Sequence, residues 1–406
     1  MKCGLLGRKL GHSYSPQIHA MLGSYSYALF EKEPDQLKDF LRHGDFAGIN
    51  VTVPYKKDVI PFLDELSPVA RRLGAVNTII RRNGKLAGHN TDYFGFLTMV
   101  RCSGLELSNK KVLVLGSGGA SNTAVAVLTE LGAHAVVISR SGENNYHNLH
   151  LHKDAYAIVN TTPVGMYPNA GIAPIDLDLF PALAGVLDVV YNPARTRLLL
   201  DAENRGLIAV NGLLMLVAQA KEAAQWFTGL QIPDDVIGEI YASLQRQMQN
   251  IILIGMPGSG KTTIGTRLAE QLGKQFVDAD AELVKRAGRT ISDIFATDGE
   301  AAFRTLETQV LADLGQKSAL VIATGGGCVT QAQNYPLLHQ NGKIFCLTRD
   351  LHKLPTDNRP LSQACKLEDM YRIRKPLYDA FADHVIANND DPITAAEQIR
   401  RIWEET

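Results

Sequence analysis

The 406-residue chain has little of several features that mark particular classes of protein. Its five cysteines are widely spaced and never form a C-x-x-C pair, which argues against a disulfide framework or a zinc site and favours a reducing compartment. An excess of charge of one sign is also missing, because 41 basic side chains are matched by 42 acidic ones. Proteins that grip a phosphate backbone usually carry a basic excess, so we expect no nucleic-acid partner.

Long apolar runs are missing as well. The longest stretches, such as GLLMLVAQA from Gly212, fall well short of the roughly 20 residues that span a bilayer. The first residues, MKCGLLGRKLGHSYSP, lack the apolar run of a signal peptide. We therefore expect a cytoplasmic protein with no membrane partner. The sequence leaves the oligomeric state open.

What the chain does have is the pattern of an α/β protein. Hydrophobic residues make up 45% of it, and its length suggests two to three domains at about 150 residues each. Short β-branched runs alternate with helical patterns, which is typical of parallel strands joined by helices. Two of the strands end in glycine-rich turns, KKVLVLGSGGAS (110–121) and NIILIGMPGSGKTT (250–263). The sequence therefore predicts two nucleotide-binding units, joined without a Gly/Ser/Pro-rich spacer.

The first glycine-rich turn is typical of a Rossmann dinucleotide site. Its glycines allow the backbone to approach a pyrophosphate at the N-terminus of the following helix. Arg140 ends the next strand, where an acidic residue would hold the ribose 2′-hydroxyl of NAD, and an arginine suits the 2′-phosphate of NADP. We therefore predict NADPH as the cofactor. The residues assigned to it here are Gly116, Ser117, Gly118, Gly119, Ala120 and Arg140.

The second turn, GMPGSGKT (255–262), is a complete Walker A sequence between a strand and a helix. Lys261 would reach the β- and γ-phosphates of ATP, and Thr262 would ligate Mg²⁺. Downstream, FVDADAEL places Asp278 and Asp280 two residues apart, on one face of a predicted strand. One aspartate can belong to the Mg²⁺ shell while the other orients a substrate hydroxyl, as a kinase requires. The residues assigned to the nucleotide are Gly258, Ser259, Gly260, Lys261, Thr262 and Thr263.

Six segments before and after the first turn resemble, in family order, the motifs of shikimate dehydrogenases: GHSYSP (11–16), NVTVPYK (50–56), GAVNT (74–78), GHNTDYFGF (88–96), YNPARTRLL (191–199) and GLLMLVAQA (212–220). The resemblance implies reduction of 3-dehydroshikimate. A ring ketone needs a hydride from the nicotinamide and a proton for the developing alkoxide; Lys56 can donate to that oxygen while Asp92 holds Lys56 in place. The side-chain amide of Asn90 is among the hydroxyl and amide groups that suit a polyhydroxylated acid. The resemblance implies that Ser13 and Ser15 take the carboxylate and that Val189 and Gly212 lie near the nicotinamide. The residues that complete the substrate pocket in this resemblance are Thr52, Asn77, Asp92, Tyr191 and Gln219.

Two departures from this family pattern are visible. Tyr93 follows Asp92 where the family often has glycine. The loop SRSGEN carries Glu143 and no second arginine, whereas the family commonly reads Asn-Arg-Thr with a further basic residue. NAD use therefore stays open, and an NAD-dependent quinate/shikimate dehydrogenase working in the degradative direction is an alternative. A protein of another class, in which one half only senses shikimate, is a second alternative.

The Walker A unit also resembles a known family. Together with its aspartates, the segments AAFRTLE (301–307), TGGG (324–327), NRPL (358–361) and RKPLY (374–378) resemble shikimate kinases. The resemblance implies transfer of phosphate from ATP to the 3-hydroxyl of shikimate. In it the shikimate-binding residues are Asp280, Arg304, Gly326 and Arg374, with the arginines on the carboxylate. Asp280 is also the candidate base, Asp278 belongs to the Mg²⁺ shell, and Arg359 lies on a lid that reaches ATP. The segment LHKLPTDN is shorter than the family's, with Lys353 as a possible substitute adenine contact.

We thus expect an α/β chain with a two-lobed dehydrogenase followed by a P-loop kinase domain, whose parallel sheet is flanked by helices. Residues 1–98 plus 213–249 would form the substrate lobe, 99–212 the Rossmann lobe, and 250–406 the kinase. The expected protein is a bifunctional shikimate-pathway enzyme of chorismate and aromatic amino-acid synthesis. Channelling of shikimate between the sites is a hypothesis that only the fusion motivates.

Overall fold

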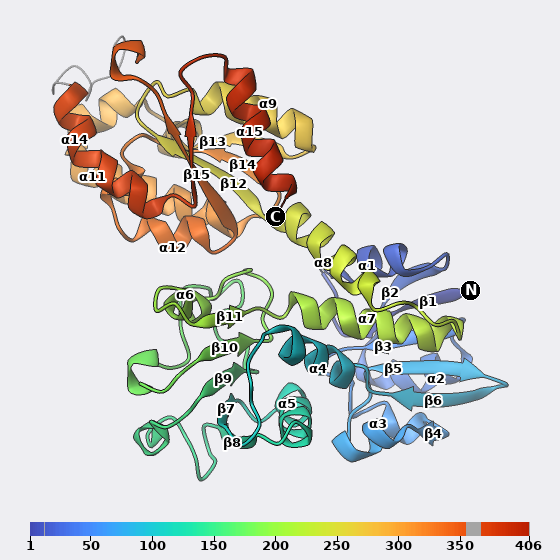
Figure 1. The fold of residues 1–406 in the computed structure, drawn as a ribbon. Coiled ribbons are helices and arrows are strands. Elements are labelled where there is room, and N and C mark those ends of the chain that lie inside the picture. Colours follow the sequence, from blue (N-terminus) through green and yellow to red (C-terminus); the bar gives the residue numbers. More distant parts are fainter. Residues whose placement is uncertain (12, 355–366, 406) are drawn as a thin grey trace. The chain divides into compact units, whose positions relative to one another are not determined.

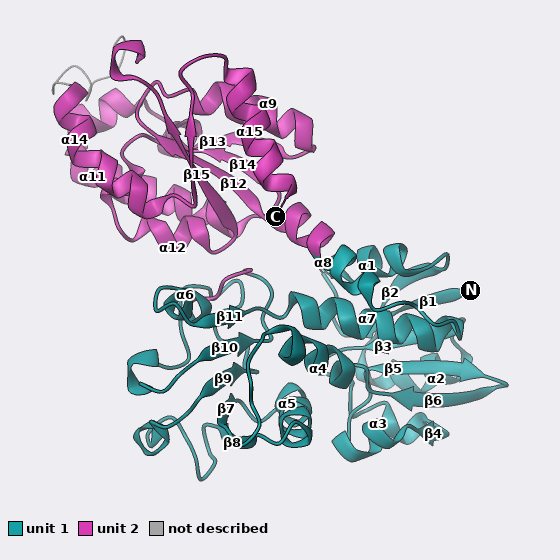
Figure 2. Ribbon diagram, in the orientation of Figure 1, with its two compact units in different colours: residues 1–192, 198–241 teal, residues 193–197, 242–406 magenta. Residues whose placement is uncertain are grey.

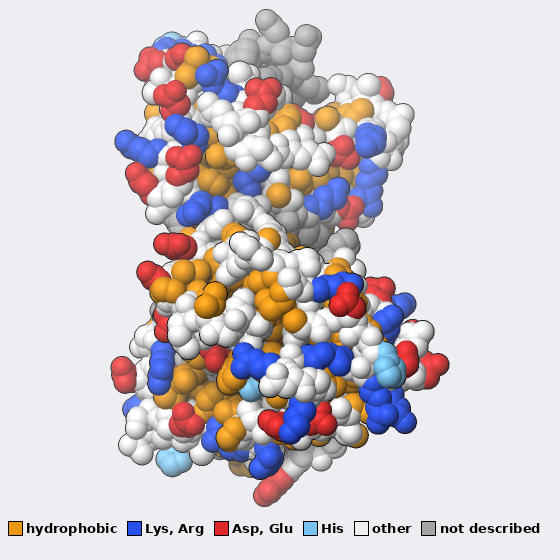
Figure 3. Space-filling view, turned by 90° about the vertical axis from the view of Figure 1, so that its right-hand side faces the viewer, with side chains coloured by type: hydrophobic (Ala, Val, Ile, Leu, Met, Phe, Trp, Pro, Cys, Tyr) orange, Lys and Arg blue, Asp and Glu red, His pale blue; other side chains and the backbone are white. Residues whose placement is uncertain are grey.

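The computed structural model of the chain describes residues 1–11, 13–354 and 367–405 (Figure 1). These residues form two compact units, one of residues 1–192 and 198–241 and the other of residues 193–197 and 242–406 (Figure 2). On the face shown in Figure 3, basic and acidic side chains are interspersed within each unit. The finer division into three parts by residue number stays a prediction.

The first sheet of the first unit is mixed. Strands β1, β2 and β3 are parallel, whereas β3 and β5, and then β5 and β6, run antiparallel. The β5–β6 hairpin turns through Asn83 and Gly84, whose φ angles of +52° and +78° fit the twist of a tight hairpin. The order across the sheet is β2 (Ser26–Glu31), β1 (Lys2–Gly7), β3 (Gly48–Val51), β5 (Thr78–Arg82), β6 (Lys85–His89) and β4 (Glu65–Leu66).

Helices pack on this sheet and carry several candidate residues. Helix α4 crosses α7 closely because Gly95 has no side chain; a Cβ there would lie 2.6 Å from the carbonyl oxygen of Met215. The helices are α1 (Ser15–Leu22), α2 (Leu37–His43), α3 (Pro68–Leu73), α4 (Asp92–Cys102) and α7 (Leu213–Thr228), and α8 (Asp235–Met248) continues into the second unit.

The second sheet of the first unit is entirely parallel. Its central strands are buried on both faces, which explains their continuous apolar runs. Helix α5 (Gly119–Glu130) starts directly after the glycine-rich turn, and α6 (Arg197–Glu203) follows later in the chain. The strand order is β11 (Ile208–Val210), β10 (Gly185–Asp188), β9 (Ala157–Asn160), β7 (Lys111–Leu115) and β8 (His134–Ile138).

The second unit is a five-stranded parallel sheet covered on both faces. Alternate residues of its central strand face different cores: Ile251 packs with α9 and α15, and Ile252 packs with α11, α12 and α14. The strand order is β13 (Gln275–Asp278), β14 (Leu320–Ala323), β12 (Asn250–Gly255), β15 (Gly342–Thr348) and β16 (His384–Ala387). The helices are α9 (Lys261–Leu272), α10 (Ala279–Ala287), α11 (Ile291–Gln316), α12 (Asn334–His339), α14 (Leu367–Phe381) and α15 (Pro392–Glu404).

Short 3₁₀ turns and one kink complete the described chain. Helix α11 is kinked at Gly299, whose φ is +80°. The 3₁₀ turns are η1 (Pro34–Gln36), η2 (Ile60–Phe62), η3 (Leu149–His152), η4 (Leu177–Leu179), η5 (Cys328–Thr330) and η6 (Leu351–Lys353). Across the described residues, every helix is too short or too polar to cross a membrane.

One local prediction is wrong. Asp278 and Asp280 do not share a strand face, because β13 ends at Asp278 and Asp280 lies in the first turn of α10. The Asp278 carboxylate accepts hydrogen bonds from the backbone N–H groups of Asp280 and Ala281, so it caps the helix N-terminus. The cap changes the backbone from extended to helical between the two carboxylates.

Two candidate active sites

A cavity of about 280 Å³ lies in the first unit. Residues from the first sheet, from α1, α4, α5 and α7, and from the segment after β10 meet there, although they are up to about 200 positions apart in the sequence. The predicted residues that line it are Ser13, Ser15, Thr52, Lys56, Asn77, Asp92, Ala120, Val189, Tyr191, Gly212 and Gln219. The structure therefore brings together every residue that the resemblance implies for the dehydrogenase substrate and nicotinamide.

Lys56 and Asp92 form an ion pair in this cavity. Lys56 follows strand β3, Asp92 is the first residue of α4, and Lys56 Nζ lies 2.6 Å from Asp92 Oδ2. The side chains are 29% and 16% exposed, so the pair is sheltered but open to a ligand. Partial burial strengthens the attraction relative to water. The geometry gives an ammonium group whose direction is set by a neighbouring carboxylate.

A network of hydrogen bonds fixes two amide side chains of the cavity. Asn77 Oδ1 accepts from the backbone N–H of Thr91 at 2.7 Å, and Asn77 Nδ2 donates to Thr91 Oγ1 at 3.0 Å. Gln219 Nε2 donates to the carbonyl of Leu216 at 2.9 Å. Asn90 is not among the lining residues; its amide donates to the carbonyl of Ala75 instead. The expectation that Asn90 offers its amide to the substrate stays a prediction.

At another part of the cavity wall lie hydroxyl groups. The backbone N–H of Ser15 donates to Ser13 Oγ at 3.2 Å, which fixes the two serines relative to each other. The ring of Tyr191 meets that of Tyr14 edge to face, with centroids 6.2 Å apart. Burial raises the pKa of Tyr191 above its ordinary value, so its hydroxyl keeps its proton at neutral pH.

Asn50 is a lining residue to which the sequence assigned no role. Its Oδ1 accepts from the Tyr27 hydroxyl at 2.7 Å, and its Nδ2 donates to Thr78 Oγ1 at 3.1 Å. The sequence does contain a feature that points to Asn50, because this residue opens the motif NVTVPYK at the end of a buried strand. What the motif alone does not show is the contact with Tyr27, which comes from a different strand.

The glycine-rich turn after β7 leaves room for a dinucleotide. Gly116 has a φ of +105°, and a Cβ added at Gly118 or Gly119 would meet open space beside the start of α5. A helix N-terminus with exposed backbone N–H groups suits a pyrophosphate. Gly212 permits a further close approach, because a Cβ there would lie 2.1 Å from the carbonyl oxygen of Val189. Arg140 is exposed just after β8, and Glu143 is exposed in the same loop.

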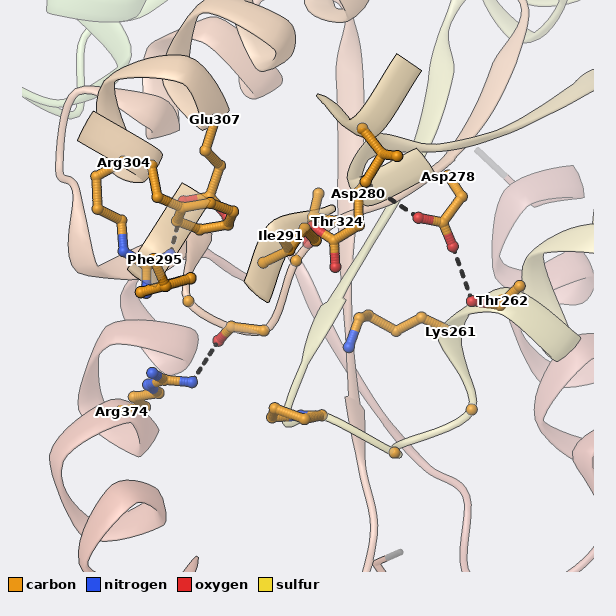
Figure 4. A pocket seen from close by; sticks show the side chains of 18 of the residues that line it. Lys261, Thr262, Asp278, Asp280, Ile291, Phe295, Arg304, Glu307, Thr324 and Arg374 are labelled. Carbon is orange, nitrogen blue, oxygen red and sulfur yellow. Dashed lines mark hydrogen bonds and ion pairs between the residues drawn. The ribbon is translucent and has the colours of Figure 1, made fainter. Parts of the chain in front are cut away.

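A larger cavity, of about 700 Å³, lies in the second unit. Figure 4 shows Arg304 and Arg374 toward one side of it and Lys261, Thr262 and Asp278 toward the other. The predicted residues that line it are Gly258, Gly260, Lys261, Thr262, Thr263, Asp278, Asp280, Arg304, Gly326 and Arg374. Ser259, also assigned to the nucleotide, is fully buried and is not among the lining residues. Arg359 lies outside the described residues.

The phosphate-binding side of this cavity is built by the Walker A loop. Gly258 and Gly260 have φ angles of +86° and +96°, which favour glycine. Lys261 Nζ donates to the carbonyls of Gly255 and Met256, at 2.9 and 3.0 Å. Thr262 Oγ1 donates to Asp278 Oδ2 at 3.0 Å. This pair of oxygen donors beside a phosphate loop fits Mg²⁺, which keeps few protein ligands and takes others from phosphates and water.

The opposite side carries two arginines. Arg304 is 6% exposed and pairs with Glu307 at 2.8 Å and Glu300 at 3.1 Å. Arg374 donates to the carbonyl of Gly326 at 3.2 Å. Burial raises the pKa of Glu307, and the Arg304 guanidinium opposes that shift. Two guanidinium groups that line the same side of the cavity form a site suited to a carboxylate.

Arg349 is a residue of this cavity that the sequence did not single out. It follows β15, and its Nη1 donates to the carbonyl of Gly258 in the Walker A loop at 3.4 Å. Its Nε is buried and has no hydrogen-bond partner among the described residues. Lys353, the suggested substitute adenine contact, does not line the cavity; its Nζ donates to the carbonyl of Asn389. Arg349 is thus a cation that lies beside the loop.

These features define two classes of enzyme in one chain. The first unit joins a parallel dinucleotide-type sheet to a second sheet and places an ion-paired lysine in a polar cavity with the dinucleotide helix. The second unit places a Walker A loop, two aspartates and two arginines around one cavity. A nucleotide-dependent dehydrogenase and a P-loop kinase are the classes that these folds and sites define.

Comparison with known proteins gives the families. The family model of the shikimate dehydrogenase substrate binding domain matches residues 5–79, and that of shikimate kinase matches residues 257–404. Shikimate dehydrogenase (NADP(+)) of Clostridium perfringens (strain SM101 / Type A) is 35% identical over 264 residues, covering 60% of this chain and 97% of its own.

Solved structures agree. A chorismate mutase/shikimate 5-dehydrogenase fusion protein from Clostridium acetobutylicum has a TM-score of 0.58 at 36% identity and covers 60% of this chain and 97% of its own. Shikimate 5-dehydrogenase from Thermus thermophilus, in complex with NADP(H) and shikimate, has a TM-score of 0.54 at 32% identity, with 60% and 99% coverage. The chain belongs to the shikimate dehydrogenase family and carries a shikimate kinase domain in its C-terminal part.

Proposed function

We propose that this chain reduces 3-dehydroshikimate to shikimate with NADPH and then phosphorylates the 3-hydroxyl of shikimate with ATP. The observation that carries the proposal is the presence, in a single chain, of two cavities with groups suited to an acidic, hydroxylated ring, one reached by the first turn of the dinucleotide helix and the other lined by the Walker A loop. Both reactions use small-molecule substrates. We place them in the cytoplasm, because few, widely spaced cysteines without a C-x-x-C pair suit a reducing compartment.

In the dehydrogenase cavity, NADPH supplies the hydride. Ser13 and Ser15 hold the substrate carboxylate. Lys56 Nζ donates to the ketone oxygen and gives it a proton as it becomes a hydroxyl, while Asp92 directs the ammonium group. Because Asn77 and Gln219 are already fixed by hydrogen bonds, they bind ring hydroxyls without further ordering.

In the kinase cavity, ATP supplies the phosphoryl group, and Mg²⁺ would be held through Thr262 and Asp278, where it would neutralise phosphate charge. Arg304 and Arg374 hold the carboxylate of shikimate on the far side of the cavity. That grip directs the ring toward Asp280, which accepts the proton of the attacking hydroxyl. Lys261 turns from the loop carbonyls toward the phosphates.

Separate assays of the two reactions test this function directly. Purified protein is expected to form NADPH from shikimate and NADP⁺, and ADP from shikimate and Mg-ATP. Quinate with NAD⁺ is the comparison substrate pair. Turnover of quinate with NAD⁺ in preference to shikimate with NADP⁺ would overturn the dehydrogenase assignment, and ATP hydrolysis that does not depend on shikimate would overturn the kinase assignment.

Arg140 is expected to set the choice of dinucleotide. Replacing it with alanine removes the cation at the 2′-phosphate position, so the KM for NADPH should rise about tenfold, in line with the loss of a charged hydrogen bond of about 1.5 kcal/mol. The KM for NADH should not change, since NADH has no 2′-phosphate. Steady-state kinetics with both cofactors checks this, and an equal rise for both would contradict it.

Arg349 is expected to contact the nucleotide in the kinase cavity. Arg349→Ala should raise the KM for ATP about tenfold and leave the KM for shikimate unchanged, because the side chain lies beside the Walker A loop. Lys353→Ala is the matched control, since Lys353 is a nearby cation outside the cavity. A larger effect from Lys353→Ala than from Arg349→Ala would show that the adenine contact suggested by the sequence was right.

A further inference from the structure

Tyr93, the residue that departs from the dehydrogenase family pattern, faces away from the cavity that Asp92 lines. Its side chain is 9% exposed and packs in a core shared by α3, α4 and α5. The hydroxyl donates to the carboxylate of Glu130, the last residue of α5. The guanidinium of Arg72 lies 5.1 Å from the centroid of the Tyr93 ring, and Arg72 Nη2 lies 3.6 Å from Glu130 Oε2. These three residues form the cluster Arg72–Tyr93–Glu130.

Each member belongs to a helix that leads directly to the dehydrogenase cavity. Tyr93 follows Asp92 in the first turn of α4. Glu130 ends α5, the helix whose first turn holds Ala120 in the cavity wall. Arg72 lies in the last turn of α3, five positions before Asn77. Figure 1 shows α4 and α5 side by side, and α5 contacts both α4 and α3. The cluster therefore joins the substrate-binding segments to the dinucleotide helix.

The charges of the cluster favour the contact between Tyr93, Arg72 and Glu130. Glu130 lies at the C-terminal end of α5, where the helix dipole disfavours a negative charge. The Tyr93 hydroxyl and the Arg72 guanidinium compensate for that placement. Burial, and then the hydrogen bond to Glu130, raise the pKa of Tyr93, so the hydroxyl stays a donor throughout the neutral pH range.

We infer that Tyr93 is a positioning residue for hydride transfer, an inference that rests on the proposed dehydrogenase function. By tying the start of α4 to the end of α5, it sets the Lys56–Asp92 pair at a reactive distance from the dinucleotide loop. Each ligand is held by its own side of the site, so the contact matters to the approach of the reactants more than to the binding of either one.

The test is Tyr93→Phe in the full chain, which keeps the buried ring and removes only the hydroxyl. The dehydrogenase kcat is expected to fall about tenfold, while the dissociation constants of NADP⁺ and of shikimate, each measured alone, change less than twofold. The isotope effect on kcat with NADPH deuterated at the transferred position should rise, because hydride transfer becomes slower relative to other steps. Tyr156→Phe is the matched control, since Tyr156 packs against the same core and its ring is contacted by Lys110.

Two further measurements keep the test decisive. Thermal unfolding of the first unit in the full chain reports whether the variant is folded. Glu130→Ala removes the acceptor on the other side of the contact, so the double variant should be no slower than the slower single variant. Unchanged kcat and isotope effect in Tyr93→Phe, or strictly additive effects in the double variant, would overturn the inference. Absence of dehydrogenase activity in the unmodified chain would instead count against the proposed function.

Discussion

Lys56→Ala is expected to lower the dehydrogenase kcat by about 10²- to 10⁴-fold, the range associated with a positioned general acid. Lys56 Nζ is held 2.6 Å from Asp92 in the cavity, where it can meet the ketone oxygen. Alanine removes the proton donor and leaves the Asp92 carboxylate without its cation. The developing alkoxide then has no partner at that position, so the transition state loses far more than the ground state.

Lys57→Ala is the matched control for this prediction, because Lys57 is the next residue and is exposed. Dehydrogenase turnover is followed by NADPH oxidation, and the kinase turnover of the same sample is followed by ADP formation. The kinase rate should stay within twofold in both variants. Equal losses in Lys56→Ala and Lys57→Ala, or retention of more than a tenth of the activity in Lys56→Ala, would show that Lys56 is not the proton donor.

Lys261→Ala is expected to produce the converse result. Kinase kcat should fall by about 10²- to 10³-fold, as for the loss of one charged donor at a transition state, while dehydrogenase turnover is unchanged. Lys261 is nearly buried at the base of the Walker A loop, with its Nζ on two loop carbonyls. Without it, charge that develops on the β- and γ-phosphate oxygens during transfer has no ammonium group to stabilise it.

The control for Lys261 is Lys285→Ala, which removes an exposed cation from the same unit. Thermal unfolding of the variants should show that Lys261→Ala stays folded. A Lys261→Ala protein that retains the kinase kcat and loses only affinity for ATP would contradict a role for Lys261 in the transition state. Loss of both activities together would point to misfolding, and a Lys261→Arg variant would then replace it as the test.

Much of both sites could be predicted from the sequence because rigid, local patterns carry their residues. The Walker A loop and the turn after β7 need glycine at fixed positions, and these glycines are visible in the sequence. The Lys56–Asp92 pair could be expected because each residue sits in a distinctive motif, although 36 positions separate them. The α/β pattern likewise indicated two nucleotide-binding units with parallel strands.

The remainder depends on contacts between distant segments or on a local competition of backbone preferences. Spacing alone predicts that Asp280 lies on a strand, because it does not reveal that Asp278 caps a helix. Arg349 reaches the Walker A loop only because β12 and β15 are neighbours in the sheet. Tyr93 was visible only as a departure, since its partner Glu130 is 37 positions away. Asn90 also lies in a distinctive motif, but its Nδ2 donates to the carbonyl of Ala75.

The measurement that tests the central claim most directly is a single reaction of the full chain with 3-dehydroshikimate, NADPH and Mg-ATP. We predict that shikimate 3-phosphate forms, with one NADPH oxidised and one ADP produced for each molecule made. Omission of NADPH should stop both reactions, whereas without ATP the reaction should end with shikimate as the product. Accumulation of shikimate in the complete mixture without its phosphate, or failure to oxidise NADPH, would contradict the account.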